Sequence, residues 1–254
     1  MQQESGSLTE RPDRTGPLLP LDDVVRRGAR QLLQTALDVE VALCLDMAKE
    51  GVLDRETTQA PIIAFLAQVF AQNSDKLSMW FKELSSLQEA HYDLVLRALW
   101  HSNMVQTNAF LRTIADQSSE KVRDRVNELL RRTPLTPLNA PMVSPAVLDI
   151  LWGAFFATGD EQYIERIISV LPWLETKGNV DRLLIGGAAQ WSLTSNAVQH
   201  QKVLNICQKQ LRKQPKEVKA ILQEIVDNAL KEIHTEGKKA ASSIPVMREC
   251  EYRT

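Results

Sequence analysis

The chain has 254 residues, 44% of them hydrophobic, which is enough to bury a substantial core and excludes a wholly disordered protein. Its 30 Lys and Arg residues nearly balance its 32 Asp and Glu residues, and the net charge of −2 gives no overall attraction to nucleic acid or to an anionic membrane. Binding to such partners must therefore be local, and the core could form one elongated domain or two compact ones.

The cysteines and the N-terminal residues indicate a cytoplasmic protein. Cys44, Cys207 and Cys250 are an odd number at wide spacing, which fits neither a disulfide framework nor a zinc module. Residues 1–23 lack the apolar segment of a signal peptide, and the longest nearly apolar run, residues 60–71, is too short to span a bilayer. A secreted or periplasmic protein whose leader had been removed would look the same.

Helical patterns begin after a polar lead-in, residues 1–20, which we expect to be disordered. Asp22 and Asp23 suit the start of a long helix, and Gly51 suits its end. The apolar positions of this helix step by three and four residues and form one stripe: Val25, Ala29, Leu32, Ala36, Val39, Leu43 and Met47. Such a face must pack against other helices.

Shorter amphipathic segments follow, separated by a few capping residues. We predict helices over residues 61–72, 75–84, 87–100, 104–117 and 121–132. Pro61 is expected in the first turn of its helix, where the missing N–H costs nothing. Together, residues 21–132 form a predicted N-terminal helical lobe. No stretch alternates with the period of a strand, so the fold is predicted to be all-α, without a sheet.

A proline-rich linker, residues 133–144, interrupts the helical pattern and is predicted to separate the two lobes. The C-terminal lobe, residues 145–236, begins with a helix ending near Thr158. Gly159 suits a left-handed residue at the helix end, and Asp160 suits the cap of the next helix. The Gly-Asp pair is therefore predicted to be a bend between two antiparallel helices.

A second helix pair, residues 183–211, has a predicted bend at Ser195–Asn196, 37 residues after Gly159. An aromatic residue, Phe155, followed by Gly159 and then by Ile164, resembles the helix-turn-helix of tetratricopeptide repeats, whose period is roughly 34 residues. The resemblance covers residues 145–213, although Trp152 stands where that family has a small residue. It implies stacked helical hairpins and a protein-binding role, and no residue of the family's ligand groove has a match here.

The last predicted helix spans residues 216–234 and ends at Gly237, before a mobile tail, residues 237–254. The positions predicted to face inward on this helix are Val218, Ile221, Leu222, Ile225 and Leu230. We expect it to cap a solenoid-like array of antiparallel hairpins.

Candidates for chemistry are few. His91 lies beside Glu89 and Asp93, but helical geometry turns it away from both, so a surface or hydrogen-bonded histidine is favoured. His200 and Cys207 share a face without further metal ligands, and Gly186–Gly187 suits close helix packing. We therefore predict no catalytic residue, no metal and no cofactor, while a triad assembled from distant residues stays open.

Basic and aromatic residues of the C-terminal lobe are the candidate contacts for a partner. These partner-binding candidates are Trp152, Trp191, Lys209, Arg212, Lys213 and Lys216. The bases could instead form a solvated face, because no aromatic residues are interleaved with them to stack on nucleotide bases.

Three functions compete at this point. The leading hypothesis is a non-enzymatic scaffold that holds a protein or peptide on a concave helical surface. The alternative is an all-α enzyme or small-ligand-binding protein with a site around His91, Asp93, Glu89 and His101. Nucleic-acid contact through residues 202–219 is a third, disfavoured possibility.

Overall fold

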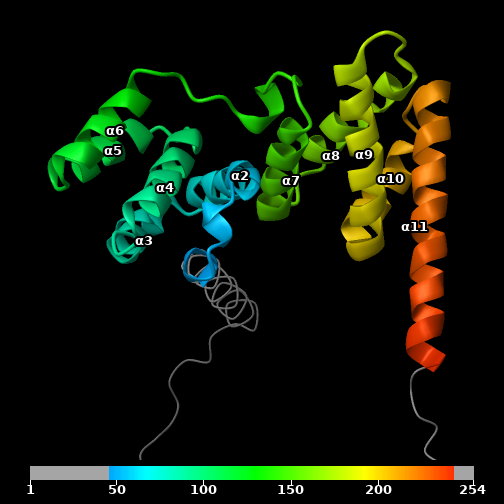
Figure 1. Ribbon diagram of the computed structural model, residues 1–254, viewed down its shortest axis with the longest axis horizontal. Coiled ribbons are helices and arrows are strands. Elements are labelled where there is room, and N and C mark those ends of the chain that lie inside the picture. Colours follow the sequence, from blue (N-terminus) through cyan, green and yellow to red (C-terminus); the bar gives the residue numbers. More distant parts are fainter. Residues whose placement is uncertain (1–45, 243–254) are drawn as a thin grey trace, which may run out of the picture. The chain divides into compact units, whose positions relative to one another are not determined.

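A computed structural model describes residues 46–242, including the side chains of residues 46–235. Within that range every regular element is helical and no strand occurs, which confirms the all-α prediction there (Figure 1). The α-helices are α2 (Glu56–Gln72), α3 (Leu77–Leu84), α4 (Glu89–His101), α5 (Thr107–Asp116), α6 (Glu120–Leu130), α7 (Ala146–Thr158), α8 (Glu161–Ile168), α9 (Val180–Gln199), α10 (Gln201–Gln210) and α11 (Lys216–Ser242). Short 3-10 helices are η1 (Val52–Asp54), η2 (Ser74–Lys76), η3 (Pro137–Asn139) and η4 (Leu171–Glu175).

The structure tests only part of the sequence predictions for the two ends of the chain. The lead-in, most of the first predicted helix, and residues 243–254 lie outside the described residues. Residues 46–49 are helical and Gly51 has φ of 70°, as predicted for the end of that first helix. In contrast, α11 continues through Gly237 to Ser242, so the end predicted at Gly237 is wrong.

Helix α2 holds the centre of the packing, because it contacts both α4 and α7. The prediction that it begins near Pro61 is wrong, since a turn of helix precedes the proline. The Thr58 hydroxyl lies within hydrogen-bond distance of the carbonyls of Val52, at 2.6 Å, and Arg55, at 2.9 Å, which ties this turn to η1. A proline costs less near the start of a helix than in its middle, and these bonds support the extra turn.

Two groups of buried side chains fill the interior. One consists of aromatic and aliphatic residues from α2 to α6, in which the ring of Phe70 lies 5.6 Å from that of Phe81, and Phe81 lies 5.4 Å from Phe110. The other is a continuous cluster from α7 to α11, with Leu151 and Ile164 fully buried. The linker between the predicted lobes contains η3, yet α2 before it packs directly against α7 after it. The division into two lobes stays a prediction.

The first bend of the C-terminal lobe is confirmed. Gly159 has φ of 66°, and Asp160 Oδ1 accepts a hydrogen bond of 3.0 Å from the backbone N–H of Gln162. The left-handed glycine ends α7, and the aspartate caps α8.

The second predicted bend is wrong. Helix α9 runs without a break through Ser195 and Asn196, and the chain turns at His200 instead. Asn196 Nδ2 donates to the Ser192 carbonyl at 2.9 Å, so this amide bonds back into its own helix rather than capping a new one. The stacking of hairpins as a solenoid stays a prediction.

Candidate interaction surface

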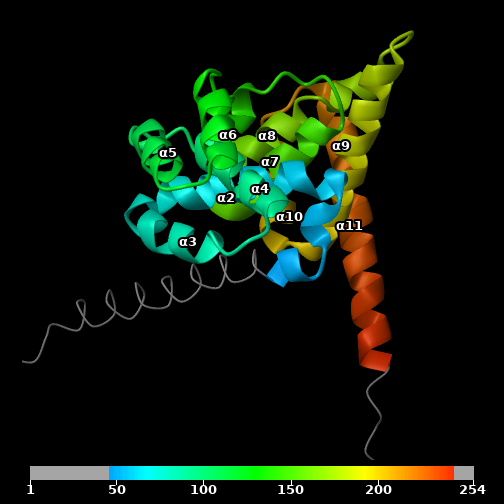
Figure 2. The same cartoon turned by 60° about the vertical axis from the view of Figure 1, so that its left-hand side comes forward.

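Helix α9 begins at Asn179, whose side chain accepts a hydrogen bond of 3.0 Å from the backbone N–H of Arg182. Its inner side repeats every four residues and is buried against α10, α11 and η4: Ile185, Ala189, Leu193 and Ala197. Helices α9 and α11 lie side by side in both views of the chain (Figure 2). The small alanines on this side let neighbouring elements approach closely.

The two adjacent glycines of α9 have different surroundings. A β-carbon on Gly186 would lie 2.8 Å from the backbone nitrogen of Leu174, so only glycine lets η4 pack there. A β-carbon on Gly187 would have nothing within 4 Å. The sequence prediction that both glycines serve close packing is therefore confirmed for Gly186 and wrong for Gly187.

The side of α9 that points away from the core is apolar. Val180, Leu184 and Trp191 are 68%, 58% and 73% exposed, and their spacing of four and seven residues puts them on one side of the helix. Leu183, which is 45% exposed, borders this side, and Gly187 lies between Leu184 and Trp191. We call these five residues the α9 outer face.

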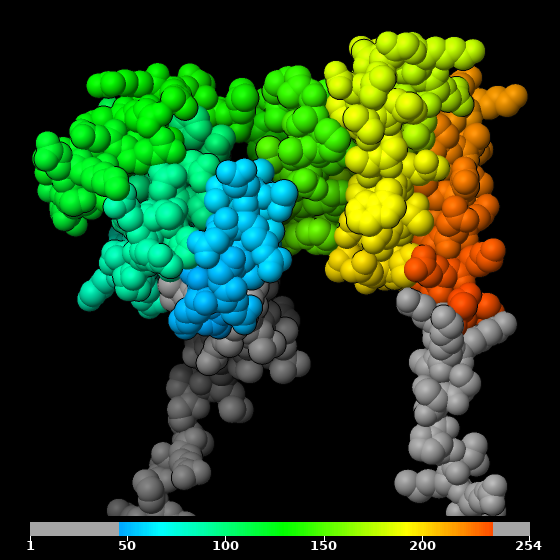
Figure 3. Space-filling view, viewed as in Figure 1, coloured from blue at the N-terminus to red at the C-terminus, as the bar shows by residue number. Residues whose placement is uncertain are grey.

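Val180 is followed by the exposed Asp181 and Arg182, but from Leu183 onward the α9 outer face has no charged neighbours within its helix. No Asp, Glu, Lys or Arg occurs between Leu183 and Gln199. A helix at a protein surface normally carries charged or polar residues opposite its buried side. Here that position holds two aliphatic residues and a tryptophan, and α9 lies uncovered beside α11 in the space-filling view (Figure 3).

A hollow of about 520 Å³ adjoins the outer face where α9 meets α11. Trp191, Ser195 and Val198 line it from α9, and Glu232 lines it from α11. With Thr194 and Gln199 also on its wall, the hollow is a largely polar border between Trp191 and the neighbouring helix.

The other predicted partner-binding residues lie apart from this face. Trp152 is only 6% exposed and packs 6.0 Å from the ring of Phe155, so its indole offers no contact surface. Lys209 pairs with Glu161 of α8 at 2.7 Å, and the Lys213 ammonium lies 3.8 Å from the Glu165 carboxylate.

Arg212 and Lys216 are exposed at the connection between α10 and α11. The acids of α8 thus balance part of the predicted basic group, and Trp191 is the one predicted residue on the outer face.

The residues of the alternative histidine site have separate partners. His91 is buried, and its Nε2 lies 2.7 Å from Asp54 Oδ1. Glu89 pairs with Lys121, and His101 Nδ1 lies 3.3 Å from the Leu135 carbonyl oxygen.

Asp93 completes this picture, because it binds two arginines, Arg97 at 3.1 Å and Arg125 through Nη2 at 3.3 Å. The structure therefore does not bring the two histidines and two acids together. Sequence reasoning missed Asp54, Arg97 and Arg125, since only the folded chain places them beside their partners.

Metal and thiol chemistry find no support in the described residues. Among them, no group of three or more His, Cys, Asp and Glu side chains could hold a metal ion. Cys207 is fully buried, and burial raises the pKa of its thiol to about 12. It is therefore protonated at neutral pH and is a structural side chain of α10.

Comparison with protein-family models, with curated proteins and with solved structures finds no match to this chain. In the part of the chain that the structure describes, no helix is both long enough and apolar enough to cross a membrane.

Proposed function

We propose that the chain is a protein-interaction module and that its α9 outer face binds the apolar side of a helix from a partner protein. One observation carries this proposal: the exposed side of α9 presents Leu184 and Trp191 in a stretch, residues 183–199, without charged residues, and Val180 lies on the same side. Contiguous exposed apolar surface of this kind is typical of protein-interaction sites.

Trp191 is expected to supply most of the binding energy. A tryptophan buries about 150–250 Å² at an interface, which at about 25 cal/mol per Å² corresponds to at most about 4–6 kcal/mol. Truncating a tryptophan hot spot to alanine typically costs about 2 kcal/mol or more in binding. Its exposure of 73% means that most of this area is still available to a partner.

A helix suits this surface better than an extended peptide. Val180, Leu184 and Trp191 are spaced four and seven residues apart. A partner helix that lies alongside α9 can match this spacing with its own residues three, four and seven apart. Gly187 leaves a gap between Leu184 and Trp191 in which a large side chain of the partner fits. Arg182 is the only basic residue of α9, and this scarcity of positive charge favours an apolar partner over nucleic acid.

The experiment places a photo-crosslinking amino acid at position 184 and, as a control, at position 105 in cells that express the chain. Val105 is equally suited to substitution, because it is fully exposed and lies outside α9. We expect a specific adduct from position 184 only, and its loss when Trp191→Ala is added. With the identified partner purified, Trp191→Ala should weaken binding about 30-fold or more.

Two results would count against the proposal. Identical adducts from positions 184 and 105 would indicate nonspecific capture, and an unchanged affinity of Trp191→Ala would show that the outer face is not the contact. Light scattering of the purified chain identifies the remaining case: a dimer that Trp191→Ala dissociates would mean that a second copy, rather than another protein, covers this face.

A further inference from the structure

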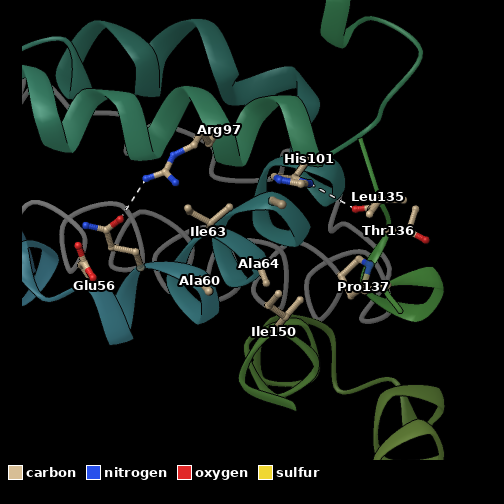
Figure 4. A pocket seen from close by; sticks show the side chains of 13 residues that line it. Glu56, Ala60, Ile63, Ala64, Arg97, His101, Leu135, Thr136, Pro137 and Ile150 are labelled. Atoms are coloured by element: carbon tan, nitrogen blue, oxygen red, sulfur yellow. Dashed lines mark hydrogen bonds between the residues drawn. The ribbon is translucent and has the colours of Figure 1, made fainter. Parts of the chain in front are cut away.

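A pocket of about 370 Å³ lies between α2 and α4, far along the chain from the α9 outer face (Figure 4). Small side chains of α2, Ala60 and Ala64, leave the space, and Ile150 of α7 borders it beside Ala64, across from α4. Leu135 and Pro137 of the linker close one end. The volume falls in the range of pockets that bind small molecules, about 300–1,000 Å³.

Arg97 brings a positive charge to this pocket. Figure 4 shows its guanidinium reaching from α4 toward α2, where Nη2 donates a hydrogen bond of 3.2 Å to Gln59 Oε1. Nε lies 3.1 Å from Asp93, which holds the group in place. Asp93 is shared with Arg125, which also pairs with Glu128 at 2.6 Å.

The pKa of Arg97 lies below its usual value, mainly because of burial. Burial lowers the pKa, Asp93 opposes that effect, and the neighbouring Arg125 lowers the pKa further. A half-buried guanidinium in such surroundings gains from an anion beside it. Two parallel hydrogen bonds to a carboxylate are the geometry that arginine forms best.

His101 lines the same pocket one helical turn after Arg97. Its Nδ1 faces the Leu135 carbonyl at 3.3 Å and must carry the proton, which leaves Nε2 as an acceptor while the ring is neutral. Burial lowers the pKa of His101, the Leu135 carbonyl opposes this, and the charge of Arg97 lowers it further. The ring is therefore neutral at pH 7 and adds no second positive charge beside Arg97.

Glu56 is the one acidic side chain on the pocket wall, and it is exposed to solvent. Water screens its charge more than that of the half-buried Arg97. Apart from Gln59, His101 and Thr136, the rest of the wall is aliphatic. A cationic ligand would be repelled by Arg97, and an uncharged one would gain no charge-assisted hydrogen bond from it.

We propose that this pocket binds a small carboxylate with an apolar body, whose carboxylate pairs with Arg97 while its hydrocarbon part lies along Ala60, Ala64 and Ile150. The site is independent of the α9 outer face. His101, a residue of the histidine site considered from the sequence, lines this pocket together with Arg97 and Gln59.

The experiment measures binding of octanoate to the full chain by calorimetry, with octan-1-ol and octylammonium as probes of equal chain length. Octanoate should bind about tenfold or more tightly than the alcohol, because a hydrogen bond to a charged group contributes more than a neutral one. Arg97→Met, which keeps an apolar stem, should remove this preference and retain the alcohol. Ala60→Leu should fill the pocket and abolish binding of both, while circular dichroism verifies that each variant is folded.

A second readout follows the His101 ring by nuclear magnetic resonance. Saturating octanoate should raise the pKa of His101, because the bound carboxylate offsets the charge of Arg97. Octan-1-ol should not raise it.

Three outcomes would overturn the proposal. The first is no octanoate binding at concentrations on the order of 1 mM. The second is equally tight binding of octylammonium or unchanged octanoate binding by Arg97→Met. The third is octanoate binding that Trp191→Ala abolishes and Ala60→Leu leaves intact, which would place the fatty chain on the α9 outer face instead.

Discussion

Gly153→Ala is the sharpest test of the packing between α2 and α7, the most extensive helix contact in the described residues. A β-carbon at position 153 would lie 2.2 Å from the Pro61 carbonyl oxygen and 3.1 Å from its α-carbon. Real β-carbons essentially never approach another heavy atom within 3.0 Å, and the obstacle is backbone that no rotamer change removes. The two helices would have to separate by roughly 1 Å.

The magnitude follows from two opposing terms. Overpacking a close contact costs typically about 1–3 kcal/mol, and replacing glycine by alanine inside a helix returns about 0.5–1 kcal/mol. Because the clash is with backbone, we expect the upper part of that range and a net loss of about 2 kcal/mol in the free energy of unfolding. Urea denaturation followed by circular dichroism measures this loss.

Gly187→Ala is the matched control, since it makes the same exchange inside a helix where a β-carbon would meet nothing within 4 Å. It should stabilise the chain by about 0.5–1 kcal/mol. If Gly153→Ala proved as stable as wild type, or if both variants shifted in the same direction, α2 and α7 would not approach each other at Pro61 as the structure shows.

Three further predictions concern the buried Leu222 and Cys207 and the partly buried His101. Leu222→Ala should lower the free energy of unfolding by about 2–5 kcal/mol, whereas Leu230→Ala on the same helix should change it by less than about 0.5 kcal/mol in the same urea titration, because Leu222 is fully buried and Leu230 is 44% exposed. In a chain whose other two cysteines are serines, Cys207 should react with a thiol reagent at pH 8 at least about a hundredfold more slowly when folded than in urea, and fast native labelling would contradict its burial. Burial lowers the pKa of His101, so as the pH falls the unfolded chain protonates this ring before the folded chain does. The stability that the neutral ring contributes is complete above about pH 6.5 and is lost as the pH falls through the folded pKa. Denaturation between pH 7 and 5 should therefore show a steeper loss for wild type than for His101→Gln, and parallel curves would refute this assignment.

Local sequence patterns were sufficient to predict the structure where a residue favours a single backbone conformation. Gly159 followed by Asp160 ends one helix and caps the next, and the structure shows both the left-handed φ of 66° and the capping bond to Gln162. The all-helical class follows in the same way, because apolar residues recur every three or four positions along most of the described chain.

Signals that depend on tertiary contacts failed. Asn196 could cap a helix or bond back to the preceding turn, and only the packing of α9 on its neighbours decides for the second. The prediction that Leu230 faces inward is also wrong, since Val226 and Ala229 face the core instead. His91 has the hydrogen-bond partner expected of a satisfied histidine, but that partner, Asp54, lies 37 residues away in the chain, where no spacing rule reaches.

The candidate interaction surface was within reach of the sequence and was missed because of the wrong bend. Once α9 is a single helix, its buried positions, such as Ile185 and Leu193, determine which side faces outward, and Leu184 and Trp191 fall on that side. Burial then does not explain why this stretch lacks charged residues, because a helix that is buried on one side needs apolar residues on that side alone. Gly187 strengthens the point, because it has no packing role in the chain itself and costs helix stability, whereas a partner side chain beside Trp191 would need the space that it leaves.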